Sequence, residues 1–160
     1  MAGSQELVVL LADDDEDDRL LVEAALSDRP VKLMCVHDGV ELIDYLLCHG
    51  QYKNMKDYPR PDLILLDLNM PRKDGRQALH EIRAHPKLRA IPVVVLTTSR
   101  ENCDVDRCYL LGANSYIVKP MTFGGLIQTL DVFHIYWDEA STLPSKELPE
   151  SCDGERERYK

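Results

Sequence analysis

One aspartate stands at the end of a short apolar run, where a reacting group would be expected. Residues 63–66 read LILL, Asp67 follows them, and Pro71 then prevents regular structure from continuing. The run is too short to cross a membrane and too apolar for a half-exposed strand. It therefore predicts a strand buried on both faces of a parallel sheet. In open α/β sheets ligand chemistry lies beyond the carboxyl ends of the strands, so Asp67 is a candidate nucleophile.

Polar residues also follow three of the other expected strands. Asp13 and Asp14 come after the first, Thr97 ends the fourth, and Lys119 comes after the fifth. Because parallel strands end at the same edge, these side chains should converge on Asp67. Three carboxylates so close would repel each other unless a cation compensates them. We therefore expect bound Mg²⁺, for which Mn²⁺ or Ca²⁺ could substitute in a crystal. A divalent cation, an ammonium and a hydroxyl around one carboxylate suit phosphoryl transfer, with Asp67 forming an aspartyl phosphate.

These groups must be positioned by strands and helices, and along the sequence a predicted strand is followed by a predicted helix five times. This alternation predicts an α/β fold, a doubly wound, flavodoxin-like (βα)5 sandwich of three layers with a five-stranded parallel sheet. Apolar stripes mark the first helix, with Leu20, Leu21, Ala24 and Ala25, and the last, with Leu126, Leu130, Phe133 and Trp137. The strands are expected over Leu7 to Ala12, Val31 to Val36, Asp62 to Asp67, Ile91 to Thr97 and Ser115 to Val118.

The 160 residues provide for one domain, expected over residues 6–140, and a tail at 141–160 whose Pro, Ser, Glu and Arg content predicts disorder. The net charge of -9 argues against nucleic-acid and anionic-membrane partners. The five cysteines show no C-x-x-C spacing, and no apolar signal segment is evident, so we expect reduced thiols and a cytoplasmic location. The histidines lack metal-ligand spacing and are expected at the surface or in turns: His37, His49, His80, His85 and His134.

The order of these motifs closely resembles that of response-regulator receiver domains, which have the CheY-like fold. The resemblance covers about residues 6–138 and lies in the acidic pair, LLDLNMP at 65–71, Thr97 after VVVL, and Lys119-Pro120 after YIV. It implies that Asp67 accepts phosphate from a phosphohistidine on a sensor histidine kinase. Such a protein is a phosphoacceptor with slow self-catalysed phosphorylation and dephosphorylation, and is not classed as an enzyme.

The resemblance also implies roles for the neighbouring residues. Asp14, Asp67 and the backbone carbonyl of Asn69 would hold Mg²⁺, with Asp13 acting through a water. Thr97 would bond one phosphate oxygen and Lys119 another. The Lys119-Pro120 peptide would be cis. Tyr116 matches the switch aromatic, which is expected to rotate inward when Thr97 moves toward the phosphate.

A narrower resemblance points to the small regulators paired with cyanobacterial phytochrome kinases. It rests on the Gln51 to Pro61 insertion, on PRKDGR at 71–76 and on LTTS at 96–99. It implies a phytochrome as the kinase and a homodimer. Output by binding is expected from the fourth helix, fifth strand and fifth helix, where Tyr109, Leu110, Ile135 and Tyr136 would be exposed apolar groups.

Two departures from the family pattern bear on the site. Three aspartates follow the first strand where two are usual, so the pair is either Asp13-Asp14, with Asp15 as a helix cap, or Asp14-Asp15. Asn69 and Thr98 flank the site and are small and polar. Attacking water is then not strongly excluded, and we expect the phosphate to last minutes or less.

Three other functions fit the sequence less well. A phosphatase of the haloacid dehalogenase type needs an acid two residues after its nucleophile, where Asn69 stands here. A flavodoxin-like carrier of FMN would have its phosphate repelled by the acidic run from Asp13 to Asp18. An inert interaction module is disfavoured because every site residue is present.

Overall fold

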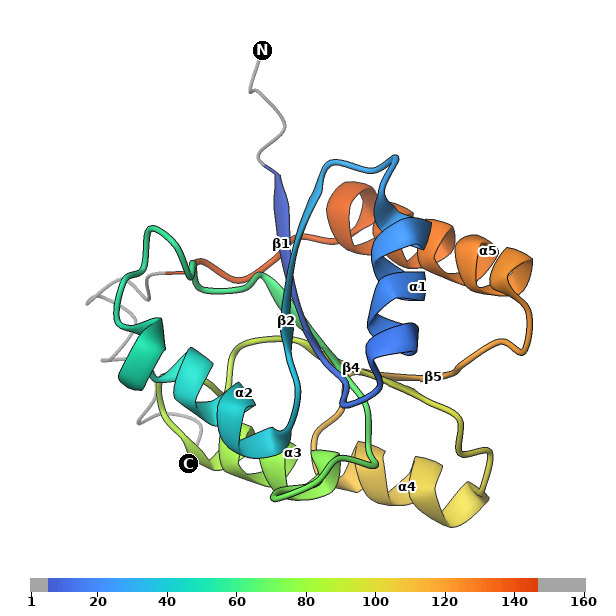
Figure 1. The fold of residues 1–160 in the computed structure, drawn as a ribbon. Coiled ribbons are helices and arrows are strands. Elements are labelled where there is room, and N and C mark those ends of the chain that lie inside the picture. Colours follow the sequence, from blue (N-terminus) through green and yellow to red (C-terminus); the bar gives the residue numbers. More distant parts are fainter. Residues whose placement is uncertain (1–5, 147–160) are drawn as a thin grey trace.

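The sheet at the centre of the molecule is fully parallel (Figure 1). A computed structural model describes residues 6–146. The strand order is β2-β1-β3-β4-β5, and the expected doubly wound five-stranded sheet is confirmed. The third strand is one residue shorter than predicted at each end, and the fourth begins two residues later than predicted. The strands are β1 (Leu7–Ala12), β2 (Val31–Val36), β3 (Leu63–Leu66), β4 (Val93–Thr97) and β5 (Ser115–Val118).

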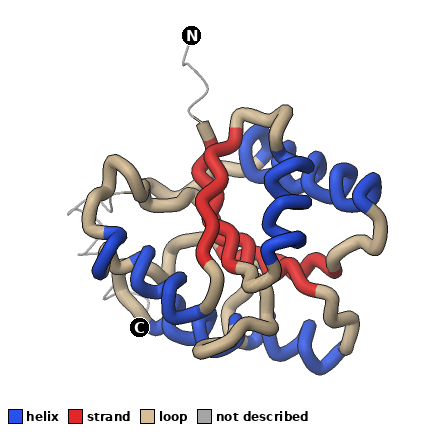
Figure 2. The backbone as a smooth tube through the Cα atoms, in the orientation of Figure 1, coloured by secondary structure: helices blue, strands red, loops and turns tan. Residues whose placement is uncertain are grey.

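Helices cover both faces of this sheet, as Figure 2 shows by the red strands between blue helices. One face carries α1 (Glu16–Leu26) and α5 (Phe123–His134), which lie side by side. The opposite face carries α2 (Gly39–Leu46), α3 (Gly75–Ala84) and α4 (Asn102–Leu110). A 3₁₀ turn over Gly50–Tyr52 follows α2, and a π-helical segment over Ile135–Ala140 extends α5.

The strands are apolar throughout because successive side chains enter two different cores. In β1, Leu10 and Ala12 pack under α2 and α3, whereas Val9 and Leu11 pack under α1 and α5. All six residues of β1 and all four of β3 are buried. This two-sided burial explains why these runs show no alternation of apolar and polar residues.

The buried face of α1 differs from the predicted stripe. The structure buries Val22, Ala25 and Leu26, whereas Leu20 and Leu21 are 55% and 41% exposed. The predicted and observed buried faces share Ala25, but the helix is turned about its axis by roughly one residue relative to the prediction. Adjacent apolar residues in this helix fit either orientation, so the sequence pattern does not decide between them. For α5 the prediction is confirmed, because Leu126, Leu130 and Phe133 are buried and Trp137 packs partly against the same core.

The beginning of the predicted tail, up to residue 146, is part of the described structure. Leu143 packs against the core of α1 and α5, and Lys146 Nζ lies 3.5 Å from Asp62 Oδ1. The rest of the expected tail, residues 147–160, lies outside the described residues.

His134 is only 3% exposed, so the prediction of a surface or turn position for it was wrong. Along residues 6–146, every helix is too short or too polar to cross a bilayer.

Candidate functional site

One lysine joins the carboxylates at the carboxyl edge of the sheet. Lys119 Nζ lies 2.7 Å from Asp13 Oδ2 and 3.0 Å from Asp67 Oδ2, so the predicted convergence of these three residues is confirmed. A third carboxylate oxygen, Asp18 Oδ2, lies 2.8 Å from the same nitrogen. An ammonium carries three N–H donors, and all three are therefore engaged with carboxylates.

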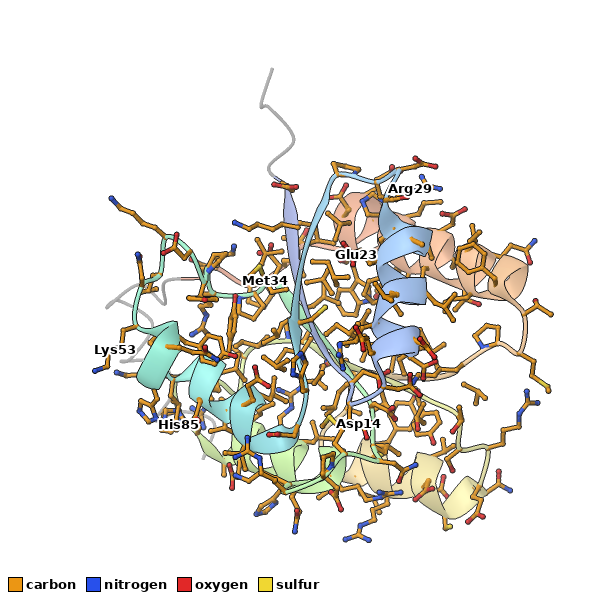
Figure 3. All side chains as sticks on the ribbon, viewed as in Figure 1. Asp14, Glu23, Arg29, Met34, Lys53 and His85 are labelled. Carbon is orange, nitrogen blue, oxygen red and sulfur yellow. The ribbon has the colours of Figure 1, made fainter. Side chains whose placement is uncertain are left out.

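Three of the aspartates could share a metal ion. Asp13, Asp14 and Asp67 each offer a carboxylate oxygen, and these atoms all lie within 4.8 Å of one another. Asp14 is exposed at the turn between β1 and α1, where Figure 3 labels it, whereas Asp13 is fully buried. Asp15 is the N-cap of α1, as one of the two registers predicts, because its Oδ1 accepts the backbone N–H groups of residues 17 and 18. An oxygen-only cluster that is open on one side fits Mg²⁺.

The acceptor candidate is fixed by the backbone on both sides. Asp67 N–H donates to Ala12 O at 2.9 Å, which continues the β1–β3 ladder, and Leu68 N–H donates to Asp67 Oδ1 at 2.7 Å. The start of α3 lies directly against it, because a Cβ on Gly75 would come within 2.2 Å of Asp67 O. Asp74 holds that helix terminus with a capping box to Gln77. Asp67 is thus fixed with 8% of its surface exposed.

Burial and the shared lysine set the protonation of the cluster. Burial raises the pKa of the Asp13 carboxyl, and the hydrogen bond from Lys119 only partly offsets this effect. Burial alone would lower the pKa of Lys119, but its hydrogen bonds to Asp13 and Asp18 and the charge of Asp67 outweigh burial and raise it. Lys119 therefore remains a cation at neutral pH and compensates the carboxylates around it.

Two further predicted residues lie along the neighbouring strands. Thr97 at the end of β4 is fully buried, and its Oγ1 has no hydrogen-bond partner within residues 6–146. An orphaned buried hydroxyl is costly, and it marks a place for another polar group. Tyr116 on β5 packs against the core under α2 and α3, and its hydroxyl donates to Ser99 O at 2.9 Å. Tyr116 is therefore half-buried and anchored to the loop before α4, and its role as a switch stays a prediction.

The loop after β3 carries the predicted carbonyl ligand and is tied to the loop after β2. Asn69 is exposed in this loop. Arg72, which has a positive φ of 63°, donates from Nε and Nη2 to Asp38 Oδ2, each at 2.8 Å. Gly39 N–H also donates to Lys73 O at 3.0 Å. These two links connect the loop to the start of α2.

The prediction of a cis peptide at Lys119-Pro120 was wrong, since the described chain contains no cis peptide bond. The trans form of such a bond is lower in energy by about 0.5–1 kcal/mol. Lys119 itself is held by its backbone N–H, which donates to Thr97 O at 2.7 Å, while its side chain reaches the carboxylates.

Sequence reasoning missed Asp18, which it treated only as a charge in the first turn of a helix. The available signal was its position three residues after the N-cap, since helical side chains tilt back toward the N-terminus. That tilt directs Asp18 toward the edge where β1 and β5 end. A cavity of about 360 Å³ opens beside this contact, and Asp18, Thr98, Arg100 and Lys119 contribute to its lining.

Comparisons with known proteins agree on one family. Residues 9–131 match the model of the response regulator receiver domain. Response regulator Rcp1 of Synechocystis sp. is 41% identical over 140 residues, which cover 86% of this chain and 93% of that protein.

Solved structures give the same result. The phosphorylated cyanobacterial phytochrome response regulator RcpA has 40% identity and a TM-score of 0.83, covering 88% of this chain and 100% of RcpA. The Mn²⁺-bound form of Rcp1 has 39% identity and a TM-score of 0.77, covering 87% of this chain and 99% of that one.

Proposed function

Because this chain belongs to the response regulator receiver family, we propose that Asp67 accepts a phosphoryl group from a phosphohistidine of a sensor histidine kinase. An Asp67 carboxylate oxygen forms the new O–P bond while the N–P bond of the donor breaks. The bonding pair stays on the imidazole nitrogen, and Asp67 itself transfers no proton. Dephosphorylation is a separate hydrolysis, in which a water oxygen forms an O–P bond, the Asp67 oxygen leaves as a carboxylate, and the water proton passes to solvent or to the released phosphate.

The observation that carries this proposal is the arrangement around Asp67. Its carboxylate lies at the end of a fully buried strand and within 3.0 Å of a lysine ammonium. Thr97 on the adjacent strand has a buried hydroxyl that lacks a partner among the described residues. Lys119 and Thr97 would each donate to one phosphoryl oxygen, which stabilises the charge on the group in transfer.

The metal site is proposed at the same three carboxylates. Asp14, Asp67 and the backbone carbonyl of Asn69 would hold Mg²⁺, and Asp13 would act through a water. The close set of carboxylate oxygens supports this assignment, and the relative Rcp1 has a Mn²⁺-bound form. When bound, Mg²⁺ would neutralise charge on the phosphoryl oxygens during transfer.

We propose a phytochrome as the cognate kinase, because RcpA is a phytochrome response regulator. A cytoplasmic location fits the cysteines, since those in the described part of the chain are free: Cys35, Cys48, Cys103 and Cys108. Cys152 lies outside that part. We also propose that the phosphate lasts minutes or less, since Asn69 and Thr98 are both exposed and neither is bulky.

Output is proposed to occur through the surface of α4, β5 and α5. Exposed apolar side chains lie on this surface, including Tyr109 and Leu110 on α4 and Val132 on α5. Tyr116 connects β5 to the loop before α4 through its bond to Ser99. Phosphorylation would change homodimerisation or partner affinity here by about 1–3 kcal/mol.

Incubation with acetyl phosphate and Mg²⁺ tests the acceptor. Intact-mass spectrometry should show the addition of one phosphoryl group to the wild type, and removal of Mg²⁺ by EDTA should prevent it. Asp67→Asn should take up none, because an amide oxygen is a poor nucleophile. Asp106→Asn is the matched control, since Asp106 is exposed on α4. Labelling of Asp67→Asn at the wild-type rate would place the acceptor elsewhere.

A further inference from the structure

Asp18 is a site residue for which the proposed reaction has no role. Its carboxylate reaches Lys119 from the first turn of α1, across 101 positions of sequence. Its side chain is 35% exposed, whereas those of Asp13 and Asp67 are 0% and 11% exposed. Asp18 is therefore the most open of the three partners of the lysine.

The three contacts leave Lys119 with no spare donor. A phosphoryl oxygen can bond to the ammonium only if one of the present acceptors yields or shares an N–H. Asp13 is fully buried and also accepts Asp15 N–H at 3.0 Å, so its position is fixed. Asp67 is the acceptor itself. Asp18 is the partner that can turn away, because it lines an open cavity and its backbone lies in a terminal helical turn.

We propose that Asp18 is a positioning residue that competes with the phosphoryl group for Lys119. Before transfer, it holds one N–H of the ammonium and adds a negative charge beside the acceptor. During transfer, that N–H becomes available to the incoming phosphoryl oxygens only as Asp18 releases it. This inference rests on the proposed function, because it assumes that Asp67 is the acceptor.

The direction of the effect follows from charge. A carboxylate near the acceptor repels an anionic phosphoryl group and weakens the hydrogen bond that Lys119 can give it. Asp18→Asn keeps the size of the side chain and removes the charge. It should accelerate phosphorylation by limiting acetyl phosphate by about threefold to tenfold, after allowance for solvent screening at a partly exposed group.

An equilibrium measurement separates this competition from a change in catalytic rate. Trifluoroberyllate is an anionic mimic of the phosphoryl group, and its binding can be followed by ¹⁹F NMR at saturating Mg²⁺. The Asp18→Asn protein should bind it about threefold to tenfold more tightly than the wild type, because a neutral amide oxygen competes for Lys119 less strongly than a carboxylate does.

Asp17→Asn is the matched control. Asp17 lies in the same helical turn, carries the same charge and is exposed. If Asp18 acted only on the helix dipole or on the net charge, the two variants would behave alike. Thermal unfolding shows whether each variant is folded, and Asp18→Ser is a second neutral variant should Asp18→Asn fail to fold.

The outcomes distinguish the two proposals. If the wild type takes up phosphate but Asp18→Asn matches Asp17→Asn in rate and affinity, the competition is wrong while the acceptor assignment stands. Slower phosphorylation of Asp18→Asn would also overturn it, since Asp18 would then be helping Lys119. If the wild type neither accepts phosphate nor binds trifluoroberyllate, the proposed function fails and this inference fails with it.

Discussion

A single ammonium group contacts three of the carboxylates at the carboxyl edge of the sheet. Lys119 has a side chain only 10% exposed and contacts Asp13, Asp18 and Asp67. Removal of one partner from a buried ion cluster is costly because the remaining charges lose their compensation. The stability of the fold and the charge of the site are thus coupled through this one residue.

Replacement of this lysine should therefore destabilise the protein, and bound metal should partly reverse the effect. Lys119→Met is expected to lower the free energy of unfolding by about 2–4 kcal/mol when EDTA is present. Added Mg²⁺ should restore part of this loss, since a cation that binds only the folded state stabilises it.

Urea unfolding with EDTA and with Mg²⁺ measures both effects. Lys87→Met, at an exposed position, is the control and should change little. A Lys119→Met protein as stable as Lys87→Met in EDTA would show that the carboxylates need no compensation.

The positions of site residues could be predicted where they follow directly from the end of a strand. They were predicted less well where they depend on how a helix packs against the sheet. Asp13, Asp67 and Lys119 follow buried strands, so their convergence follows from the parallel sheet. The contact of Asp18 with Lys119 depends on how α1 is rotated on the sheet, and the apolar pattern misplaced that rotation. The burial of His134 depends in the same way on the packing of its helix.

At the scale of elements, the loop after β3 owes its position to a contact with another loop. Arg72 and Asp38 are 34 positions apart in the sequence. Burial alone would raise the pKa of Asp38, but the backbone N–H of Glu41 and the Arg72 guanidinium outweigh it and lower the pKa. The ionised form of Asp38 therefore stabilises the folded protein and the loop that carries Asn69.

This link should give the protein a recognisable acid sensitivity. Because the folded pKa of Asp38 lies below its ordinary value of 3.8, its contribution to stability is complete above that value. It is lost as the pH falls through the folded pKa. Arg72→Ala removes one cause of the shift and should reduce the dependence of unfolding free energy on pH in this acid range.

Urea unfolding at a series of pH values measures this dependence. Arg100→Ala is the control, since Arg100 is exposed in the loop before α4. Identical acid profiles for Arg72→Ala and the wild type would mean that the contact with Asp38 has no effect on stability.

The elements themselves were readable from the sequence because apolar runs and turn residues mark them. Every strand and every one of the five helices was predicted, and Asp15 was identified as a possible cap. The π-helical extension of α5 was not, because the apolar stripe continues through Trp137 as an ordinary helix would. The Asp38–Arg72 link was also missed, since no local pattern relates residues in two different loops.

At the scale of the whole molecule, α4 and α5 leave apolar side chains uncovered. Leu110 is 88% exposed and Val132 is 67% exposed. If this surface mediates the proposed homodimer, Leu110→Ser should weaken self-association by about tenfold, the usual scale for a significant interface contact. Phosphorylation by acetyl phosphate should be unchanged, because Leu110 lies outside the site.

Sedimentation equilibrium before and after phosphorylation measures self-association. Met55→Ser is the matched control, since Met55 is 59% exposed in the segment between α2 and β3. If Leu110→Ser and Met55→Ser associate equally, the dimer uses another surface or does not form.

Asp62 holds both the beginning and the end of the described chain. Its Oδ2 accepts Val8 N–H at 2.8 Å, and its Oδ1 lies 3.5 Å from Lys146 Nζ. Asp62 precedes the first residue of β3 and Asp67 follows its last residue, so the two carboxylates lie at opposite ends of this strand. The polypeptide thus reaches Lys146 on the side remote from Asp67, and a fluorescent reporter attached at that residue would lie at the opposite end of the sheet from the carboxylate cluster.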